Sequence, residues 1–284
     1  MDAALEFLLT WIIKVISFST NNSHLTASLS GFSPALYKYA NLILDSVMKP
    51  IGYNILALFI VYELQRIALK VESSSGGSPH LGFEMVMKSI IKVAFCKIAM
   101  DKINVIMGAI VGVTTYMTKE IEALNFDSSQ VEKALDVKEI LKPLAKEGTT
   151  TKMGIFILLV MALLVTIGSV IIVQAIVSMR FVEMYAYLSV SPIPIATFPS
   201  DEFSNIGKNF LKLFSASALQ GTLIFITMQM YPFLLATVFK DIANGGSGTE
   251  VFLNSLIGIL ANSVILVFAV MATGRWAKSI TNAM

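Results

Sequence analysis

The sequence predicts an all-α, polytopic membrane protein with about five transmembrane helices, an interfacial amino-terminal helix and a proline-broken re-entrant or interfacial element. Of its 284 residues, 55% are apolar and 14% are charged, whereas soluble domains carry about 25% charged residues. One run, 154–179, contains no charge and is longer than the roughly 20 residues that cross a bilayer as a helix. Pro192 and Pro194 follow this run, and interrupted backbone is tolerated in a membrane only against protein or a water-lined cavity.

Residues 3–18 predict an amphipathic helix that lies in the headgroup region instead of crossing the bilayer. The run is shorter than the roughly 20 residues needed to cross, and Trp11 suits an interfacial anchor. Its acidic start and the lack of a small-residue cleavage site argue against a removable signal peptide. Apolar residues share one side at helical spacing: Leu5, Leu8, Leu9, Ile12 and Ile16.

We expect a single membrane domain, which divides along the chain into four segments. They are an amino-terminal helix and loop (1–40), the first two crossings with a cytoplasmic amphipathic segment (43–118), an external polar loop (119–152) and the remaining crossings with the proline motif (153–284). The five crossings are expected at about 43–65, 98–118, 154–179, 213–239 and 251–273.

Two segments separate the first three crossings. In the first, Lys88 and Lys92 are one helical turn apart among apolar residues, so this segment is expected to lie along the membrane surface. The second, 119–152, carries six lysines and seven acidic residues and predicts two short helices outside the bilayer. It is either a solvated connector or a docking surface for a substrate or partner.

Some polar and small residues fall within the predicted crossings or at their ends. Lys97 and Asp101 are four residues apart and predict a structural pair or snorkelling lysines, in preference to a functional relay. Gly108 and Gly112 form a GxxxG pattern that lets another helix approach closely. The remaining intramembrane polar residues are Gln174, which is expected to face protein, Gln220 and Gln229.

Sequence motifs for catalysis or cofactor binding are missing. The chain has no GxxxxGK[ST] phosphate loop, no HExxH and no GxSxG nucleophile turn. One cysteine and two distant histidines, His24 and His80, make no metal cluster, and the net charge of +2 is too small for a protein that coats nucleic acid. We therefore expect a conduit or scaffold and not an enzyme, with no cofactor and with energy supplied by a gradient or a partner.

The stretch 180–203 is the first candidate for function, because charge and helix breaks coincide there. Arg180 and Glu183 are three residues apart, and we expect them to form an ion pair at the membrane face, where isolated charge is costly. Pro192 and Pro194 would then turn the chain back as a re-entrant or interfacial element between protomers. The alternative is a rigid corner that makes no contact with a substrate.

This stretch resembles the central motif of TrbL-type conjugal transfer proteins, the polytopic inner-membrane subunits of type IV secretion systems. The residues that carry the resemblance are Arg180, Glu183 and Tyr185, followed by Pro192-Ile193-Pro194 and small residues to Thr197. It extends through Gly207 and Lys208 to Gln220-Gly221. In its compact length the chain looks more like versions from integrative elements of Gram-positive bacteria than like the large Gram-negative ones.

The resemblance implies a subunit of the membrane channel that moves single-stranded DNA with its attached relaxase between cells. It also implies a bacterial inner-membrane location with the amino terminus outside and the carboxyl terminus in the cytoplasm. The implied partners are membrane lipid, other type IV secretion subunits with their ATPases, DNA in transit, and further copies in a homo-oligomer. The charge pattern favours this orientation only slightly, since eleven of the 21 basic residues would lie inside.

Two other function classes remain open. A small-solute transporter predicts an internal repeat, and no second Pro-x-Pro element stands in a matching position. A pore-forming or passive scaffold protein predicts activity without partner ATPases.

Overall fold

The computed structural model describes residues 2–20, 27–73, 79–124, 137, 148–244 and 248–283, and all structural statements below concern these residues. Within them the chain is helical and contains no strand, so the predicted all-α class is confirmed. The two short helices expected within 119–152 fall outside the described residues. The elements in order are α1 (Asp2–Thr20), α2 (Leu29–Phe32), α3 (Pro34–Ile43), the π-helical turn η1 (Leu44–Met48), α4 (Lys49–Ser73), α5 (Pro79–Asp101), α6 (Ile103–Ala123), α9 (Thr149–Val190), α10 (Pro192–Ile195), α11 (Ser204–Asn244) and α12 (Gly248–Ile280).

Four helical stretches of the described chain are long and apolar enough to cross a membrane, which makes this a polytopic membrane protein. They are Pro34–Ser73, Thr149–Val190, Ser204–Leu234 and Ile257–Ile280. The crossing expected over 98–118 is not among them: its first residues end α5, the rest form α6, and the carboxyl end of α6 carries Lys119, Glu120 and Glu122. The two helices meet at Lys102, beside Asp101, where the charged residues lower the apolar content.

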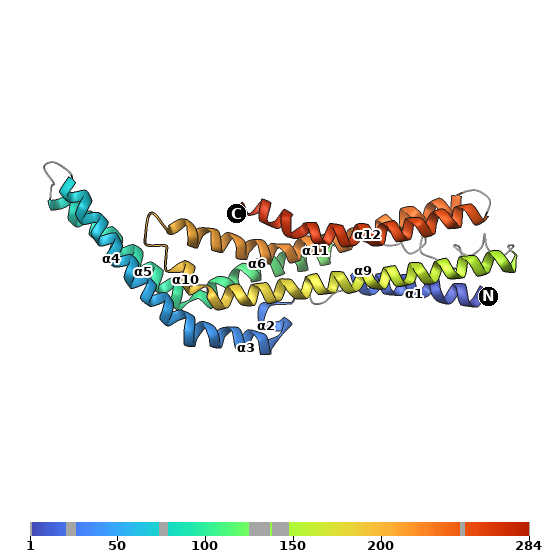
Figure 1. Cartoon of the computed structure of the whole chain (residues 1–284), viewed down its shortest axis with the longest axis horizontal. Coiled ribbons are helices and arrows are strands. Elements are labelled where there is room, and N and C mark those ends of the chain that lie inside the picture. The colour runs from blue at the N-terminus through green and yellow to red at the C-terminus, as the bar shows by residue number, and fades with distance from the viewer. Residues whose placement is uncertain are drawn as a thin grey trace. The chain divides into compact units, whose positions relative to one another are not determined.

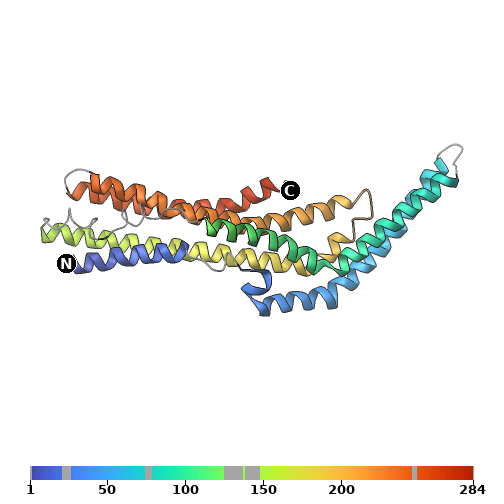
Figure 2. The same cartoon turned by 180° about the vertical axis from the view of Figure 1, so that it is seen from behind.

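The described residues form two compact units. The first takes in segments 1–26, 116–179 and 221–275, and the second takes in 27–115, 180–220 and 276–284. In the first unit α1 runs beside the first half of α9 (Figures 1 and 2), and the Asp2 carboxylate lies 2.7 Å from Lys152 Nζ. The apolar side of α1 is buried in protein at Leu5 and Ile12, whereas Trp11 is exposed. The interfacial placement of α1 stays a prediction.

The second unit contains a helical hairpin and the proline motif. Helices α4 and α5 lie side by side and antiparallel in both views (Figures 1 and 2). At the base of this hairpin the Tyr53 hydroxyl donates a hydrogen bond to the Asp101 carboxylate. The short helix α10 packs mainly against α4.

Helix α9 continues well beyond the predicted end of its crossing near residue 179. It runs without interruption through Arg180 to Val190, and the break comes at Ser191, immediately before Pro192. Pro192 occupies the first turn of α10, a position where its missing N–H leaves no bond unmade. The helix therefore ends where the prolines require it to end.

We call residues 191–203 the corner. Its backbone is bonded through consecutive tight turns, with the Thr197 N–H 3.3 Å from the Pro194 carbonyl and the Ser200 N–H 3.2 Å from the Thr197 carbonyl. Its buried residues are Ser191, Pro192, Ile195, Ala196, Thr197, Pro199 and Ser200. Interrupted backbone thus lies against protein, as the membrane setting demands.

Two glycines let neighbouring helices approach the corner closely. A Cβ atom on Gly207 of α11 would lie 2.7 Å from the Pro194 carbonyl oxygen, closer than real contacts allow. A Cβ atom on Gly52 of α4 would lie 2.8 Å from Pro192 Cβ. Both prolines therefore pack onto backbone that carries no side chain.

We expect Gly207→Ala to lower the free energy of unfolding by about 1–3 kcal/mol, the usual cost of overpacking. The added methyl group would meet a backbone carbonyl that cannot swing aside. Thermal unfolding of the purified protein in detergent measures the change. The matched control is Gly168→Ala in α9, where a Cβ atom meets nothing within 4 Å and alanine favours the helix. Equal stability of the two variants would contradict this packing.

Candidate functional site

The end of α9 is fastened to the amino-terminal helices of the second unit. The Tyr185 hydroxyl donates to the Leu29 carbonyl at 2.7 Å, which satisfies a buried group at the start of α2. The Ser189 hydroxyl reaches the Ala40 carbonyl of α3 at 3.3 Å. Phe181 stacks on Phe32 with ring centroids 3.9 Å apart. Tyr185, selected from the sequence motif, therefore holds this helix in place.

The ion pair expected between Arg180 and Glu183 is not formed, although both residues are described. Glu183 instead accepts hydrogen bonds from the Tyr187 hydroxyl at 2.8 Å and the Ser217 hydroxyl at 3.3 Å. Both of its oxygens are thereby occupied, one by the next turn of α9 and the other by α11. Arg180 is buried, its guanidinium lies 4.4 Å from the Phe181 ring centroid, and its Nε has no hydrogen-bond partner.

Side-chain hydrogen bonds tie the corner to α5 and α11. The Cys96 thiol of α5 donates to the Ile195 carbonyl at 3.1 Å. Burial raises the pKa of Cys96 to about 12, so the thiol keeps its proton. Thr197 donates to the Pro194 carbonyl at 2.7 Å and accepts from the Gly207 N–H at 3.2 Å. The hydrogen bond from Gly207 to Thr197 lies at the contact between α11 and the corner where there is no room for a side chain on Gly207.

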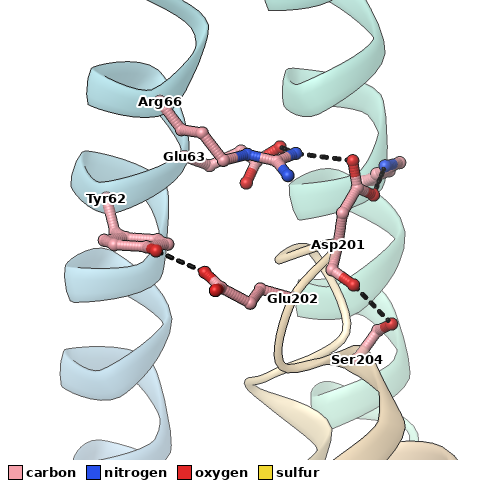
Figure 3. Close-up of polar contacts among 7 residues, drawn as sticks. Tyr62, Glu63, Arg66, Asp201, Glu202 and Ser204 are labelled. Atoms are coloured by element: carbon pink, nitrogen blue, oxygen red, sulfur yellow. Dashed lines mark hydrogen bonds and ion pairs between the residues drawn. The ribbon is translucent and has the colours of Figure 1, made fainter. Parts of the chain in front are cut away.

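Four charged residues from three elements form what we call the ionic clamp: Glu63, Arg66, Lys92 and Asp201. Arg66 of α4 lies between two carboxylates, 2.5 Å from Glu63 and 2.6 Å from Asp201 (Figure 3). Lys92 of α5 approaches the other oxygen of Asp201 at 2.5 Å. The clamp thus connects α4 and α5 to the turn at the end of the corner.

The electrostatics of the clamp differ between its two carboxylates. Asp201 is half-exposed. Hydrogen bonds, first from Lys92 and then from Arg66, lower the pKa of its carboxyl group, which is therefore ionised at neutral pH. The Glu63 side chain is only 4% exposed and depends on Arg66 for its counter-charge. Beside the clamp, Tyr62 donates to Glu202 (Figure 3), and Phe203 packs against Tyr62 and Phe59. A buried carboxylate with one cation is the most vulnerable part of the arrangement.

Other residues selected from the sequence are not brought together. Lys97 is exposed and makes no ion pair with Asp101, which the Tyr53 hydroxyl contacts instead. The three glutamines, Gln174, Gln220 and Gln229, are each partly buried. Gly108 and Gly112 are exposed, and a Cβ atom on either would meet nothing within 4 Å. No described helix of this chain uses the GxxxG surface.

The site consists of ion pairs and hydrogen bonds that join helices of this chain. Within the described ranges, no three histidine, cysteine or acidic residues are grouped to hold a metal ion. The clamp went unpredicted because its partners are 109 and 135 positions apart in the sequence. The available signal was Glu63 and Arg66, three residues apart at the end of a predicted crossing.

We expect Arg66→Gln to lower the free energy of unfolding by about 3 kcal/mol, because it leaves Glu63 buried without a cation. Lys88→Gln is the control, since it breaks an exposed pair with Glu84 in which the side chains are 69% and 49% exposed. Such surface pairs contribute about 0.3–0.5 kcal/mol. Denaturation of both variants in the same detergent compares them. A loss of similar size in both would show that the buried clamp adds nothing special.

The model of the family described as TrbL/VirB6 plasmid conjugal transfer like protein matches residues 10–192, more than half of the chain. Neither the curated proteins nor the solved structures give a match. The matched range includes Arg180, Glu183 and Tyr185 and reaches the first proline of the corner.

Proposed function

The chain belongs to the TrbL/VirB6 family of plasmid conjugal transfer-like proteins, and on that premise we propose that it is a channel or scaffold subunit of a type IV secretion machine. The machine would move single-stranded DNA, with the relaxase attached, from one cell to another. The family match over 10–192 is the observation that carries the proposal. The four candidate membrane spans fit a subunit that lines or frames a path through a membrane.

The protein would act without catalysis of its own. Its sequence has no nucleotide-binding loop, so the energy for transfer would come from separate ATPases of the machine. Its partners would be those ATPases, the other channel subunits, membrane lipid, DNA in transit and further copies of this chain. A ring of copies is the natural way to enclose a path wider than one helical bundle.

In this proposal the corner has a mechanical role. A path for a polymer must keep its width while the substrate moves, so its subunits need helices held at fixed positions. The corner receives hydrogen bonds or ion pairs from α4, α5 and α11, while the end of α9 is bonded to α2 and α3. This network supports a rigid framework at the point where the chain changes direction.

The DNA path is tested by crosslinking in mating donor cells that carry a tagged copy of this chain in a deletion background. We expect the transferred strand to be enriched over a non-mobilised plasmid when the chain is isolated after formaldehyde treatment. Donors that lack the relaxase are the control and should give no enrichment. Normal conjugation by the deletion strain would exclude the proposal. Solute flux by the purified protein in liposomes would favour a transporter or pore.

The proposed location is the cytoplasmic membrane, with the amino terminus outside and the carboxyl terminus inside, an arrangement that requires α6 to cross as a fifth segment beside the four candidate spans. It is tested with single cysteines in a Cys96→Ser background, in which serine keeps a donor for the Ile195 carbonyl. We expect Thr149→Cys to react with a membrane-impermeant maleimide in intact cells, and Ser279→Cys to react only after permeabilisation. Both positions are exposed in the folded chain. The reverse pattern would invert the proposed orientation.

A further inference from the structure

The outward side of α5 carries a long apolar stripe that the described chain leaves uncovered. Its members are between 40% and 69% exposed: Phe83, Met87, Ile90, Ile91, Phe95 and Ile98. At 1.5 Å per residue the stripe extends for about 22 Å along the helix. The opposite side, which includes Ser89, Cys96 and Met100, is buried in the second unit.

Lysines border this stripe on both sides. With 3.6 residues per turn, Lys88 and Lys97 lie roughly 90° to either side of the middle of the stripe. Both are exposed; Lys88 Nζ lies 2.6 Å from the Glu84 carboxylate on the same helix, whereas Lys97 makes no ion pair among the described residues. Lys92, farther round on the Lys88 side, is engaged by Asp201. A helix half-immersed in the surface of a bilayer would have both bordering lysines at the level of the lipid phosphates.

Composition separates α5 from the helices that cross the membrane. Five charged residues in its 23 positions exclude it from the candidate spans. The neighbouring stretch, Pro34–Ser73, has 40 residues, about twice the length that a crossing needs. Helix α4, which lies along α5 from Tyr53 beside Asp101 to Val71 beside Gly82, therefore need not lie wholly within the bilayer. A helix with an apolar stripe but too many charged residues to cross the bilayer fits the boundary between the headgroups and the acyl chains.

We infer that the outward side of α5 rests in the surface of an anionic phospholipid bilayer, with Phe83 and Phe95 at the acyl-chain boundary and Lys88 and Lys97 on the phosphates. Glu84 already balances Lys88, so it is Lys97, whose exposed charge has no acidic partner among the described residues, that favours anionic lipid over a protein partner. Lipid contact would hold the α4–α5 hairpin at the membrane while the ionic clamp fixes its middle to the corner. The inference concerns the purified protein in lipid and does not depend on DNA transfer.

The test measures the depth of α5 in nanodiscs that contain phosphatidylglycerol and phosphatidylcholine. Bimane is attached to single cysteines at Phe83, Ile91 and Ile98 in the full-length Cys96→Ser protein. We expect a shallow doxyl-labelled lipid to quench all three positions to a similar extent, and a deep one to quench them less. Gln65→Cys, exposed on α4, is the control and should be quenched by aqueous iodide and not by lipid.

The lysine contribution is measured in the same discs. Lys97→Gln should weaken the anionic-lipid dependence of shallow quenching by about fivefold, the usual contribution of one basic residue at such a surface. Lys119→Gln in α6 is the matched control and should have no effect. A depth that changes steadily from Phe83 to Ile98 would show that α5 crosses the bilayer and would overturn the inference. Quenching by iodide alone, or by neither agent, would overturn it in favour of water or a protein partner.

Discussion

The structure depends on one constraint: where a helix is interrupted in a membrane protein, the backbone carbonyls left without a donor must find hydrogen-bond partners in the protein. Pro192 and Pro194 remove two donors and end α9, so the carbonyls near them need other partners. The corner meets this need with tight turns and with donors from Cys96 and Thr197. Packing follows from the same need, since α4 and α11 both present glycine where they approach the prolines.

The ionic clamp extends this arrangement to the far side of the corner. Without Arg66, Asp201 would still have Lys92, whereas Glu63 would keep a buried charge with no cation. Glu63 and Arg66 lie on the same helix and move together, so the contact between Arg66 and Asp201 is what fixes the position of α4 against the corner. Buried pairs of this kind are weak evidence for stability but can specify one arrangement. In this chain the clamp specifies how the α4–α5 hairpin meets the corner.

Much of the fold was predictable because it follows from composition and helical periodicity. The charge-free run of α9, the amphipathic α1 and the break at the prolines all have local causes in the sequence. Helix α9 continues past the expected end of its crossing to Val190, because charge at Arg180 can mark a membrane boundary without ending a helix. The split of 98–118 was missed because two charged residues at the α5–α6 junction looked like the edge of a single crossing.

The site was predictable only where its residues are close in sequence. Arg180 and Glu183 have the correct spacing for an ion pair, yet Ser217, 34 positions away, takes one Glu183 oxygen. The residues that carry the sequence resemblance lie between Arg180 and Gly221, whereas the family match covers 10–192, and the two overlap at the end of α9. The pairing of Asp201 with Arg66 and Lys92 joins distant segments, and a single sequence contains no signal for such pairs.

The position of Cys96 has a consequence for biochemical work on this protein. It is the sole sulfhydryl of the sequence, and it lies under the Ile195 backbone with its proton retained. Air oxidation of cell extracts therefore has no accessible sulfur in this polypeptide with which to bridge neighbouring molecules. Bands of doubled mass on a non-reducing gel would report non-covalent association that survives detergent, or a disulfide between two copies of Cys96 exposed by unfolding.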